Sequence, residues 1–422
     1  MSRLFIRLSP LALALAAVSP AHATNGYLAN GYGLSSEGAG GVAAALPQDA
    51  LVIATNPAGI SALDNRLDAS INYFVPKREA SITGNGFAPD ATYDGNGKKS
   101  FLIPAFGYVH RLNPALTFGL AVYGNGGMNT VYQTNPYQRF GATGEAGVNL
   151  EQLFVTPALS WKVNDRNSLG IAANLAYQRF EAKGLSPFAG FSIDPAHLTD
   201  QGLDSSTGAG VRLGWLGTPI DRLSLGAGWA SKISTGHFDK YRGLFAGEGG
   251  FDIPETLTLG AALKPADGLT VALDWQKIKY SDVAAVGNPI ANLFQGNPLG
   301  SANGGGFGWK DISVLKLGVV YDLSKDLTLR AGYAKAGQPV PQGETFFNIL
   351  APGVITKHWT LGATWHLNPR NEVSVAYTRA LKETVNGVHS IPPGAPPAGL
   401  GGGEANVSLS ENILGIGWGL KL

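Results

Sequence analysis

Apolar residues alternate with small or polar residues along most of the chain from position 66 onward. In the first such segment, Leu67, Ala69 and Ile71 are separated by Asp68 and Ser70. A period of two predicts β-strands whose two faces meet different surroundings. Fourteen segments carry this pattern, of which the second fits less cleanly: 67–75, 101–110, 116–122, 155–163, 169–177, 211–215, 223–229, 257–263, 269–275, 315–321, 327–333, 359–365, 373–377 and 414–420.

The connections between these segments alternate in length. We expect short turns at 113–114, 164–167, 218–220, 265–268, 322–325 and 368–371. We expect long loops at 77–100, 124–149, 184–205, 234–253, 281–309, 337–355 and 383–406. An even number of antiparallel strands, with short and long connections in alternation, is typical of a transmembrane β-barrel of the bacterial outer membrane. A closed barrel also pairs every backbone N–H and C=O group, as hydrocarbon requires.

The two faces of the segments favour a membrane barrel over a soluble β-sandwich or propeller. The second face of a soluble sheet carries many Lys and Glu residues, whereas here it carries small residues such as Thr258, Gly260 and Ala262. Such residues suit a confined lumen, and the apolar face suits lipid. Aromatic residues near the segment ends are expected to form the interfacial belt of the barrel: Tyr73, Trp161, Tyr177, Trp229, Trp275, Tyr321, Trp365 and Trp418.

Composition and motifs argue against several functions. Charged residues make up 14% of the chain, against roughly 25% in soluble proteins. A net charge of +1 gives no field that attracts nucleic acid, so none is expected as a partner. The chain has no Cys and its His residues are scattered, so we expect no metal site and no cofactor. Catalytic motifs are missing and we expect no catalytic residues, although an outer-membrane hydrolase or a general porin stays open as an alternative.

Residues 1–23 have the features of a secretory signal peptide. Arg3 and Arg7 precede an apolar run over 8–18, and a small-x-small cleavage site ends at Ala23. The run is shorter than the about 20 residues that a membrane-spanning helix needs. We therefore expect cleavage before Thr24 and export to the outer membrane of a Gram-negative bacterium.

Residues 24–64 do not follow the strand pattern. They are rich in small residues, and Asn56 followed by Pro57 predicts the start of a helix, with Asn56 as its N-cap. The segment is too apolar to stay disordered. We expect it to form a hatch, or plug, inside the mouth of a barrel built from residues 65–422.

The ordered motifs of this sequence resemble the FadL group of outer-membrane transporters for long-chain fatty acids, which includes TodX-like channels for aromatic hydrocarbons. The similarity spans the mature chain and rests on the following residues: Gly38-Ala39-Gly40, Gln48-Asp49-Ala50, Asn56-Pro57-Ala58, the set Asn174, Tyr177 and Arg179, Ile253-Pro254-Glu255, Trp309-Lys310-Asp311 and Pro339-Val340-Pro341.

The resemblance implies a passive transporter with a fourteen-stranded barrel and an N-terminal hatch. It implies an apolar groove between extracellular loops that captures the ligand, and a second binding pocket above the hatch. The ligand would leave sideways through a gap in the wall made by an inward kink of the third strand. The ligand would be a long-chain fatty acid or a similar hydrophobic molecule, with aromatic hydrocarbons or alkanes as the alternative. Other expected partners are outer-membrane lipid and detergent-like amphiphiles, and we expect a monomer.

Two long loops carry ten large apolar residues that water alone should not surround. We interpret them as the ligand groove, or alternatively as side chains that pack on one another to stiffen the loops. In loop 184–205 they are Leu185, Phe188, Phe191, Ile193 and Leu198, and in loop 234–253 they are Phe238, Tyr241, Leu244, Phe245 and Phe251.

Two further positions carry expectations about the route. The third strand runs into Gly124, Gly126 and Gly127, and glycines in a strand favour bulges and bends, so a kink is expected there. Arg179 lies where the resembling family has a pocket arginine and is a candidate partner for a carboxylate. Counting by twos from Leu169 places Arg179 on the apolar face, so it either turns inward at a bulge or lies beyond the hydrocarbon.

Overall fold

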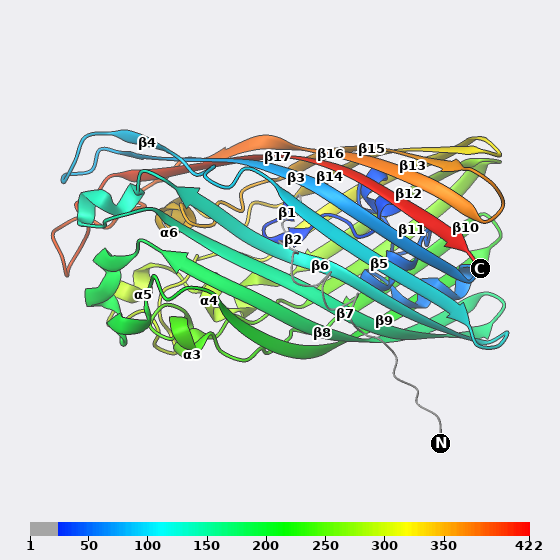
Figure 1. Ribbon diagram of the computed structural model, residues 1–422, viewed down its shortest axis with the longest axis horizontal. Coiled ribbons are helices and arrows are strands. Elements are labelled where there is room, and N and C mark those ends of the chain that lie inside the picture. Colours follow the sequence, from blue (N-terminus) through cyan, green and yellow to red (C-terminus); the bar gives the residue numbers. More distant parts are fainter. Residues whose placement is uncertain (1–23) are drawn as a thin grey trace, which may run out of the picture.

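The computed structural model describes residues 24–422, and the expected signal peptide lies outside these residues. Fourteen antiparallel strands form a closed barrel, and each contains one of the predicted segments (Figure 1). Each strand pairs with the next, and the last pairs with the first from Lys421 opposite Arg66 to Glu404 opposite Thr83. The strands are β3 (Arg66–Thr83), β5 (Phe101–Arg111), β6 (Leu116–Tyr132), β7 (Ala146–Asn164), β8 (Asn167–Lys183), β9 (Asp204–Ile220), β10 (Leu223–Ala230), β11 (Thr256–Ala266), β12 (Leu269–Ile278), β13 (Ile312–Ser324), β14 (Leu327–Ala336), β15 (Lys357–His366), β16 (Asn371–Val385) and β17 (Glu404–Lys421).

Short turns lie at one end of the barrel and long loops at the other (Figure 1). Several strands continue beyond the predicted segments at the loop end. The clearest correction concerns β6, which runs to Tyr132, whereas a loop was expected from residue 124. The outer face of this part no longer meets hydrocarbon, so the apolar alternation fades although the backbone pairing continues.

The long loops fold into short elements above the barrel. Strand β4 (Ala91–Asp94) extends the sheet by pairing with β3. The loop helices are η4 (Pro136–Phe140), η5 (Ser186–Phe191), η6 (Pro195–His197), η7 (Asp239–Tyr241), α3 (Ala246–Gly249), η8 (Tyr280–Asp282), α4 (Ala284–Gly287), α5 (Ala291–Phe294), η9 (Gln342–Glu344) and α6 (Thr345–Asn348). Within residues 24–422, no helix is both long enough and apolar enough to cross a membrane.

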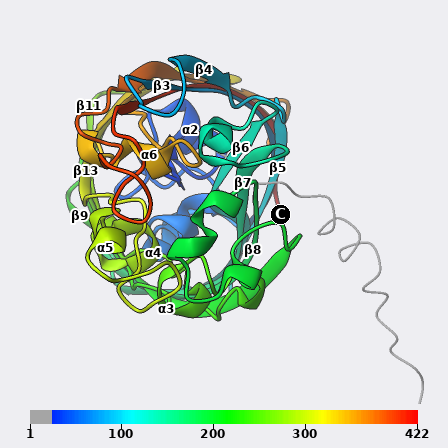
Figure 2. The same cartoon turned by 90° about the vertical axis from the view of Figure 1, so that its left-hand side faces the viewer.

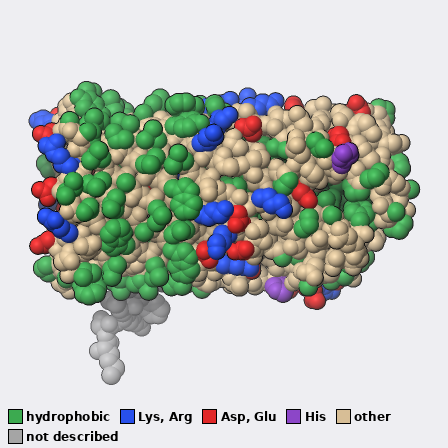
Figure 3. Space-filling view, turned by 180° about the vertical axis from the view of Figure 1, so that it is seen from behind, with side chains coloured by type: hydrophobic (Ala, Val, Ile, Leu, Met, Phe, Trp, Pro, Cys, Tyr) green, Lys and Arg blue, Asp and Glu red, His purple; other side chains and the backbone are tan. Residues whose placement is uncertain are grey.

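The outer surface carries a broad apolar band over the half of the barrel nearer the short turns (Figure 3). The predicted apolar face supplies it, with side chains such as Ile171, Leu361 and Trp359 about half exposed or more. Charged side chains bound the band on both sides (Figure 3). An apolar band bounded by charged side chains is the surface expected of a membrane-spanning β-barrel.

The N-terminal segment folds inside the ring of strands as the hatch (Figure 2). Asn56 caps its last helix, accepting a hydrogen bond from the backbone N–H of Ala58 at 3.1 Å, with Pro57 in the first helical position. The Asn56 amide also donates to the carbonyl of Trp215 in β9 at 2.8 Å, so the predicted cap ties the hatch to the wall. The hatch elements are β1 (Thr24–Asn25), β2 (Leu28–Ala29), α2 (Leu34–Gly38), η2 (Ala50–Ala54) and η3 (Pro57–Ala62).

Glycines on the lumen face of the strands leave the space that the hatch fills. A Cβ atom on Gly226 would collide with the carbonyl of Ala44, and one on Gly170 would collide with the backbone of Ala58. The small residues that the sequence places on the second strand face therefore meet the backbone of the hatch.

Polar wall residues hold the hatch in place. Asp274 accepts hydrogen bonds from the backbone N–H groups of Ala43 and Ala44 at 2.8 and 2.9 Å. Lys316 donates to the carbonyl of Asn30 at 2.7 Å. Asp274 lies on β12 and Lys316 on β13, and the bond from Asn56 reaches β9, so the hatch is bonded to three strands of the wall.

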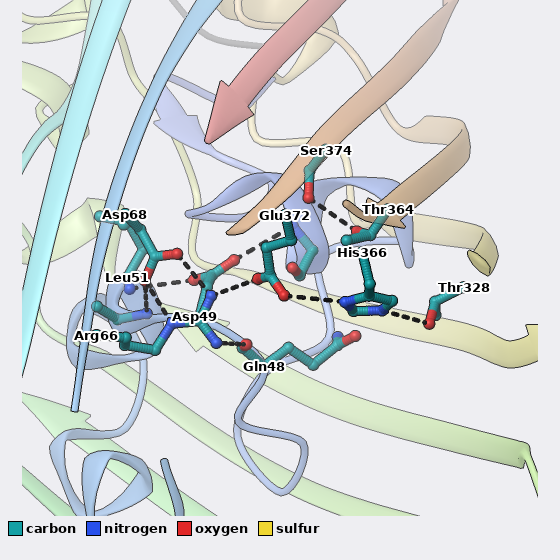
Figure 4. A network of polar contacts seen from close by, with 12 residues as sticks. Gln48, Asp49, Leu51, Arg66, Asp68, Thr328, Thr364, His366, Glu372 and Ser374 are labelled. Carbon is teal, nitrogen blue, oxygen red and sulfur yellow. Dashed lines mark hydrogen bonds and ion pairs between the residues drawn. The ribbon is translucent and has the colours of Figure 1, made fainter. Parts of the chain in front are cut away.

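A charged network joins the hatch to the wall near the short-turn end (Figure 4). Arg66 forms ion pairs of 2.6 Å with both Asp68 and Glu372, and its guanidinium also donates to the carbonyl of Gln48 in the hatch at 3.1 Å. His366 extends the network, with Nδ1 lying 3.2 Å from Glu372. The network connects β3 and β16 through the base of the hatch, where a straight path to the periplasm would run.

Candidate ligand-binding cavities

The long loops enclose an apolar cavity of about 480 Å³. Four of the predicted groove residues line it, namely Leu185, Phe188, Leu244 and Phe245. The rest of the lining is also free of charged side chains: Val148, Phe180, Ala285, Leu299, Gly305, Gly306, Phe307, Phe347 and Leu350. Such a cavity suits an apolar ligand and offers no partner for a charged head group.

The other predicted groove residues serve different purposes. Phe238, Tyr241 and Phe251 are fully buried, and Phe238 and Tyr241 pack on Phe180 with ring centroids 5.5 and 4.9 Å apart. Leu198 is buried as well, Phe191 is partly buried, and Ile193 is exposed. The two sequence-based interpretations thus divide among the residues, with some at the cavity and others stiffening the loops.

Residues from a third and a fourth loop also line the cavity and were not predicted. Phe347 and Leu350 come from the loop between β14 and β15, and Leu299 and Phe307 from the loop between β12 and β13. The sequence did indicate an apolar surface in the loop between β14 and β15. This long loop contains the large apolar residues Phe346, Phe347, Ile349 and Leu350. Like the apolar residues of the first two loops, these side chains are too numerous to be surrounded by water alone.

An ion-pair cluster joins the two loops that carry the predicted groove residues. Asp194 accepts a hydrogen bond from Nε of Arg242 at 2.6 Å and lies 3.0 Å from Nδ1 of His197. Hydrogen bonding to His197 and then to Arg242 lowers the pKa of Asp194 to about 2. The carboxylate is therefore ionised at any physiological pH, and its ion pair with Arg242 continues to join the two loops.

Strand β6 is irregular at the predicted glycines. Its pairing with β7 shifts register between Gly124 and Gly126, and the hatch residue Leu28 pairs with Gly126. A Cβ atom on Gly126 would collide with the carbonyl of Tyr27, so this approach of strand and hatch requires glycine. The third barrel strand thus bends toward the hatch at the glycines.

Beside this bend the wall has a gap in backbone pairing. Strand β5 pairs with β6 only between Phe106 opposite Val122 and Arg111 opposite Thr117. Residues 101–105 of β5 and 123–130 of β6 are not paired with each other, and we call this stretch the wall gap. A cavity of about 400 Å³ lies there, lined by Thr24, Gly26, Phe74, Pro76, Arg78, Phe101, Gly127, Met128, Asn129, Ala351, Pro352, Gly353, Leu409 and Glu411.

A third cavity, of about 410 Å³, lies between the hatch and the wall and contains a buried arginine. Arg212 of β9 is 7% exposed and, among residues 24–422, has no hydrogen-bond or ion-pair partner. The Asn174 amide nitrogen, on the neighbouring strand β8, is also buried without a partner. The remaining lining combines hatch, kinked strand and wall: Leu28, Ala29, Tyr32, Ala54, Asn125, Phe154, Ala230, Ser231, Ile233, Ile253, Pro254, Thr256 and Gln276.

Two unpartnered donors in one cavity can donate hydrogen bonds to an oxyanion. An unpaired buried guanidinium is costly, and a carboxylate is the partner that its geometry matches best. Tyr32 connects this cavity to the bend in β6, because its hydroxyl donates to the carbonyl of Asn125 at 3.0 Å. Sequence reasoning missed Arg212, although counting by twos from Val211 places it on the lumen face.

The inward alternative for Arg179 is wrong. The pairing of β7 with β8 is regular at this position, so Arg179 stays on the outer face with Tyr177, and it forms an ion pair with Glu151 directly opposite. Glu181 and Lys183 follow on the same face, where the apolar side chains have ended. Arg179 therefore lies beyond the hydrocarbon, which was the other expectation from its position.

Within residues 24–422, no group of three His, Cys, Asp or Glu side chains is placed to hold a metal ion. The linings contain carbon surfaces, amides and hydroxyls, with Arg212 in the cavity beside the hatch and both Arg78 and Glu411 in the cavity at the wall gap.

Many solved structures are similar to this chain, and three of them serve as examples. The toluene transporter TodX of P. putida has a TM-score of 0.66 at 18% identity, covering 93% of this chain and 99% of that one. A FadL homologue of Pseudomonas aeruginosa has a TM-score of 0.68 at 18% identity, covering 94% and 99%. The toluene transporter TbuX of Ralstonia pickettii has a TM-score of 0.64 at 17% identity, covering 93% and 99%. At these identities the likeness shows the fold, and no curated protein matches the sequence.

The family model described as outer membrane protein transport protein (OMPP1/FadL/TodX) matches residues 12–390. The closed fourteen-stranded barrel and its N-terminal hatch are consistent with this match. On this evidence the chain belongs to the OMPP1/FadL/TodX family of outer-membrane channels for hydrophobic compounds.

Proposed function

We propose that this channel carries long-chain fatty acids, or similar amphiphiles with a carboxylate head, by passive diffusion across the outer membrane. The observation that carries the choice of ligand is the unpartnered Arg212 in the cavity beside the hatch. A hydrocarbon would leave this guanidinium without a counter-ion, whereas a carboxylate would pair with it.

The three cavities support a route with distinct stages. The loop cavity captures the acyl chain, because burial stabilises a chain by about 0.8 kcal/mol per CH₂ group. The cavity beside the hatch then receives the head group at Arg212. The hatch blocks the straight path through the lumen, so the ligand leaves sideways at the wall gap, where Gly124, Gly126 and Gly127 bend the strand.

A second candidate ligand is an aromatic hydrocarbon. The loop cavity has no charged lining, and two of the similar structures are described as toluene transporters. In that case Arg212 would be paired with water or with another ion during transport. Alkanes would use the same apolar surfaces.

We also propose the division of the chain into a cleaved signal peptide (1–23), a hatch (24–64) and a barrel (65–422). The buried carboxylate of Glu411 supports cleavage before Thr24, because it accepts a hydrogen bond from the backbone nitrogen of Thr24 at 3.0 Å. Cleavage there makes this nitrogen an ammonium group and gives Glu411 a counter-ion. N-terminal sequencing of the exported protein tests the boundary, and a start other than Thr24 contradicts it.

The proposal includes no enzymatic step and no partner subunit, since each stage uses cavities within one chain. We propose a monomer, surrounded by outer-membrane lipid or by detergent-like amphiphiles after extraction. Mass measurement of the purified, folded protein in detergent checks the oligomeric state.

Competition binding tests the ligand assignment. Purified, folded protein is titrated with a labelled long-chain fatty acid, and unlabelled fatty acid, toluene and a short sugar are added as competitors. We expect displacement by unlabelled fatty acid, weak displacement by toluene and none by sugar. Binding of toluene without any binding of fatty acid would move the assignment to hydrocarbons, and displacement by sugar would contradict an apolar path.

A further inference from the structure

On the face of the barrel seen in Figure 3, a belt of charged side chains crosses the surface where the apolar band ends on the loop side. Strands β14 to β16 carry three basic side chains next to aromatic ones on the outer face. Each basic residue either lies two residues along the strand from an aromatic residue or pairs with one on the neighbouring strand. Lys335 follows Tyr333, Lys357 precedes Trp359, and Arg379 lies opposite Trp359. Interfacial aromatic residues mark the depth of the lipid head groups, so this part of the belt lies at head-group depth.

Most basic residues of the belt on β8, on β12 and just beyond the loop-side ends of β10 and β12 have acidic partners. These pairs neutralise one sector of the belt and leave little for an anion to bind. They are Arg179 with Glu151, Lys183 with Glu145 at 2.9 Å, Lys232 with Asp252 at 3.0 Å, Lys277 with Asp311 at 3.9 Å and Lys279 with Glu255 at 3.0 Å.

The sector on β14–β16 differs, and we call Lys335, Lys357 and Arg379 the basic cluster. Among residues 24–422, none of the three forms an ion pair with a carboxylate. Lys335 and Lys357 lie directly opposite each other in the β14–β15 pairing. Arg379 donates one hydrogen bond, to the neutral amide oxygen of Asn412 at 3.0 Å.

The acidic residues near the basic cluster are engaged elsewhere. Glu79 pairs with Lys382 at 3.7 Å. Glu383 accepts a hydrogen bond from the hydroxyl of Thr356 at 2.7 Å. Lys77 on β3 flanks the cluster and adds a further positive charge, so the sector keeps an excess of positive charge.

Like charges placed directly opposite in a sheet are destabilising, and an anion bridging them removes the penalty. A phosphate group is doubly charged or nearly so and accepts hydrogen bonds from several Lys and Arg donors at once. The loop end of an outer-membrane barrel faces the outer leaflet, whose head groups are phosphorylated glycolipids. We propose that the basic cluster is a binding site for the phosphate groups of an outer-leaflet glycolipid of the lipid A type.

The surface below the cluster favours a lipid over a free phosphate ion or a protein partner. Trp359 and Leu361 continue down β15 from Lys357 and are 56% and 61% exposed. Acyl chains attached to a phosphorylated head group would cover these side chains while the phosphates meet the cluster. A free anion leaves the apolar part uncovered, and a soluble protein cannot reach below head-group depth.

The test compares two triple variants of the full-length folded protein. Lys335→Gln/Lys357→Gln/Arg379→Gln removes the cluster, and Lys232→Gln/Lys277→Gln/Lys279→Gln removes the same charge from the paired sector. Both are titrated in detergent with diphosphoryl lipid A and with lipid A stripped of phosphate, and bound lipid is counted by native mass spectrometry. A change in gel mobility on boiling confirms that each variant is folded. If the first triple variant does not fold, the single variant Lys357→Gln replaces it.

We expect the cluster variant to bind diphosphoryl lipid A at least tenfold more weakly than the unmodified protein, with the single variant about threefold weaker. The paired-sector variant should change affinity less than twofold. Equal losses in the two triple variants, or equal binding of lipid A with and without phosphate, would overturn the proposal. Displacement of lipid A by equimolar inorganic phosphate would also overturn it, because it would show an ion site without a lipid contribution.

Discussion

Replacing Arg212 by Leu is the sharpest single-residue test of the carboxylate site. The substitution removes the guanidinium and keeps an apolar side chain in a cavity whose other neighbours include Phe154, Ile233 and Ile253. Arg212 has no partner within residues 24–422, so no internal ion pair is lost. We therefore expect the barrel to keep its stability or to gain slightly, in contrast to the loss expected when a paired buried charge is removed.

The magnitude for binding follows from the contacts that a carboxylate can make. A charge-assisted hydrogen bond contributes about 1.5–3 kcal/mol. A loss of about 2 kcal/mol corresponds to roughly thirtyfold weaker binding. We expect this loss for a long-chain fatty acid and no loss for a hydrocarbon of equal chain length, because only the head group meets Arg212.

The assay is equilibrium binding of a labelled fatty acid and of a labelled alkane to folded protein in detergent. Arg179→Gln is the matched control, since Arg179 lies on the outer face and should leave both affinities unchanged. Equal weakening of fatty acid and alkane by Arg212→Leu would refute the reasoning, because it would mean that the substitution altered the cavity rather than the charge. Unchanged fatty-acid binding would refute the role of Arg212 while leaving transport of apolar compounds intact.

Three further changes probe the hatch and the loops. Gly226→Val places a side chain against the carbonyl of Ala44, and the overpacking should cost about 1–3 kcal/mol and loosen the hatch. The leak of small sugars into liposomes that contain the protein should therefore rise. The control variant Gly190→Ala, which has open space around the new methyl group, should not change the leak. Deleting residues 25–63 should turn the selective path into an open pore, and unchanged sugar passage would contradict the role of the hatch. Phe188→Asp should weaken fatty-acid binding at least tenfold, because it places a charge in the apolar loop cavity. The melting temperature of the barrel should stay within a few degrees. Unaltered binding would show that the loop cavity is not part of the route.

The sequence revealed the barrel because lipid imposes a simple rule on each strand. Every second residue between the two interfaces must be apolar, so thirteen strands could be located from clear alternation and β5 from a weaker form of it. The rule stops where the outer face leaves hydrocarbon, which is why the extension of β6 to Tyr132 was missed. Strand length above the membrane depends on pairing with neighbours, and a single sequence does not display this.

Individual site residues were predictable to different degrees. Counting by twos along the strand placed Arg179 on the outer face, whereas the family motif suggested a pocket residue. The count was correct because side chains alternate between the two faces of a strand unless a bulge intervenes, and the pairing is regular here. The same count applied to Val211 and Arg212 would have placed a charge in the lumen. The division of the loop residues could not be predicted, since Phe188 packs on Phe346 from a loop far away in the sequence.

The most direct test of the account is a crystal structure of the protein with a long-chain fatty acid brominated at its far end. Anomalous scattering locates the bromine, and the electron density locates the head group. We expect the carboxylate to lie within hydrogen-bonding distance of the Arg212 guanidinium and the chain to lie against the apolar lining of the same cavity. A carboxylate bound on the outer face near Arg179, or a chain running straight down through a displaced hatch, would contradict it.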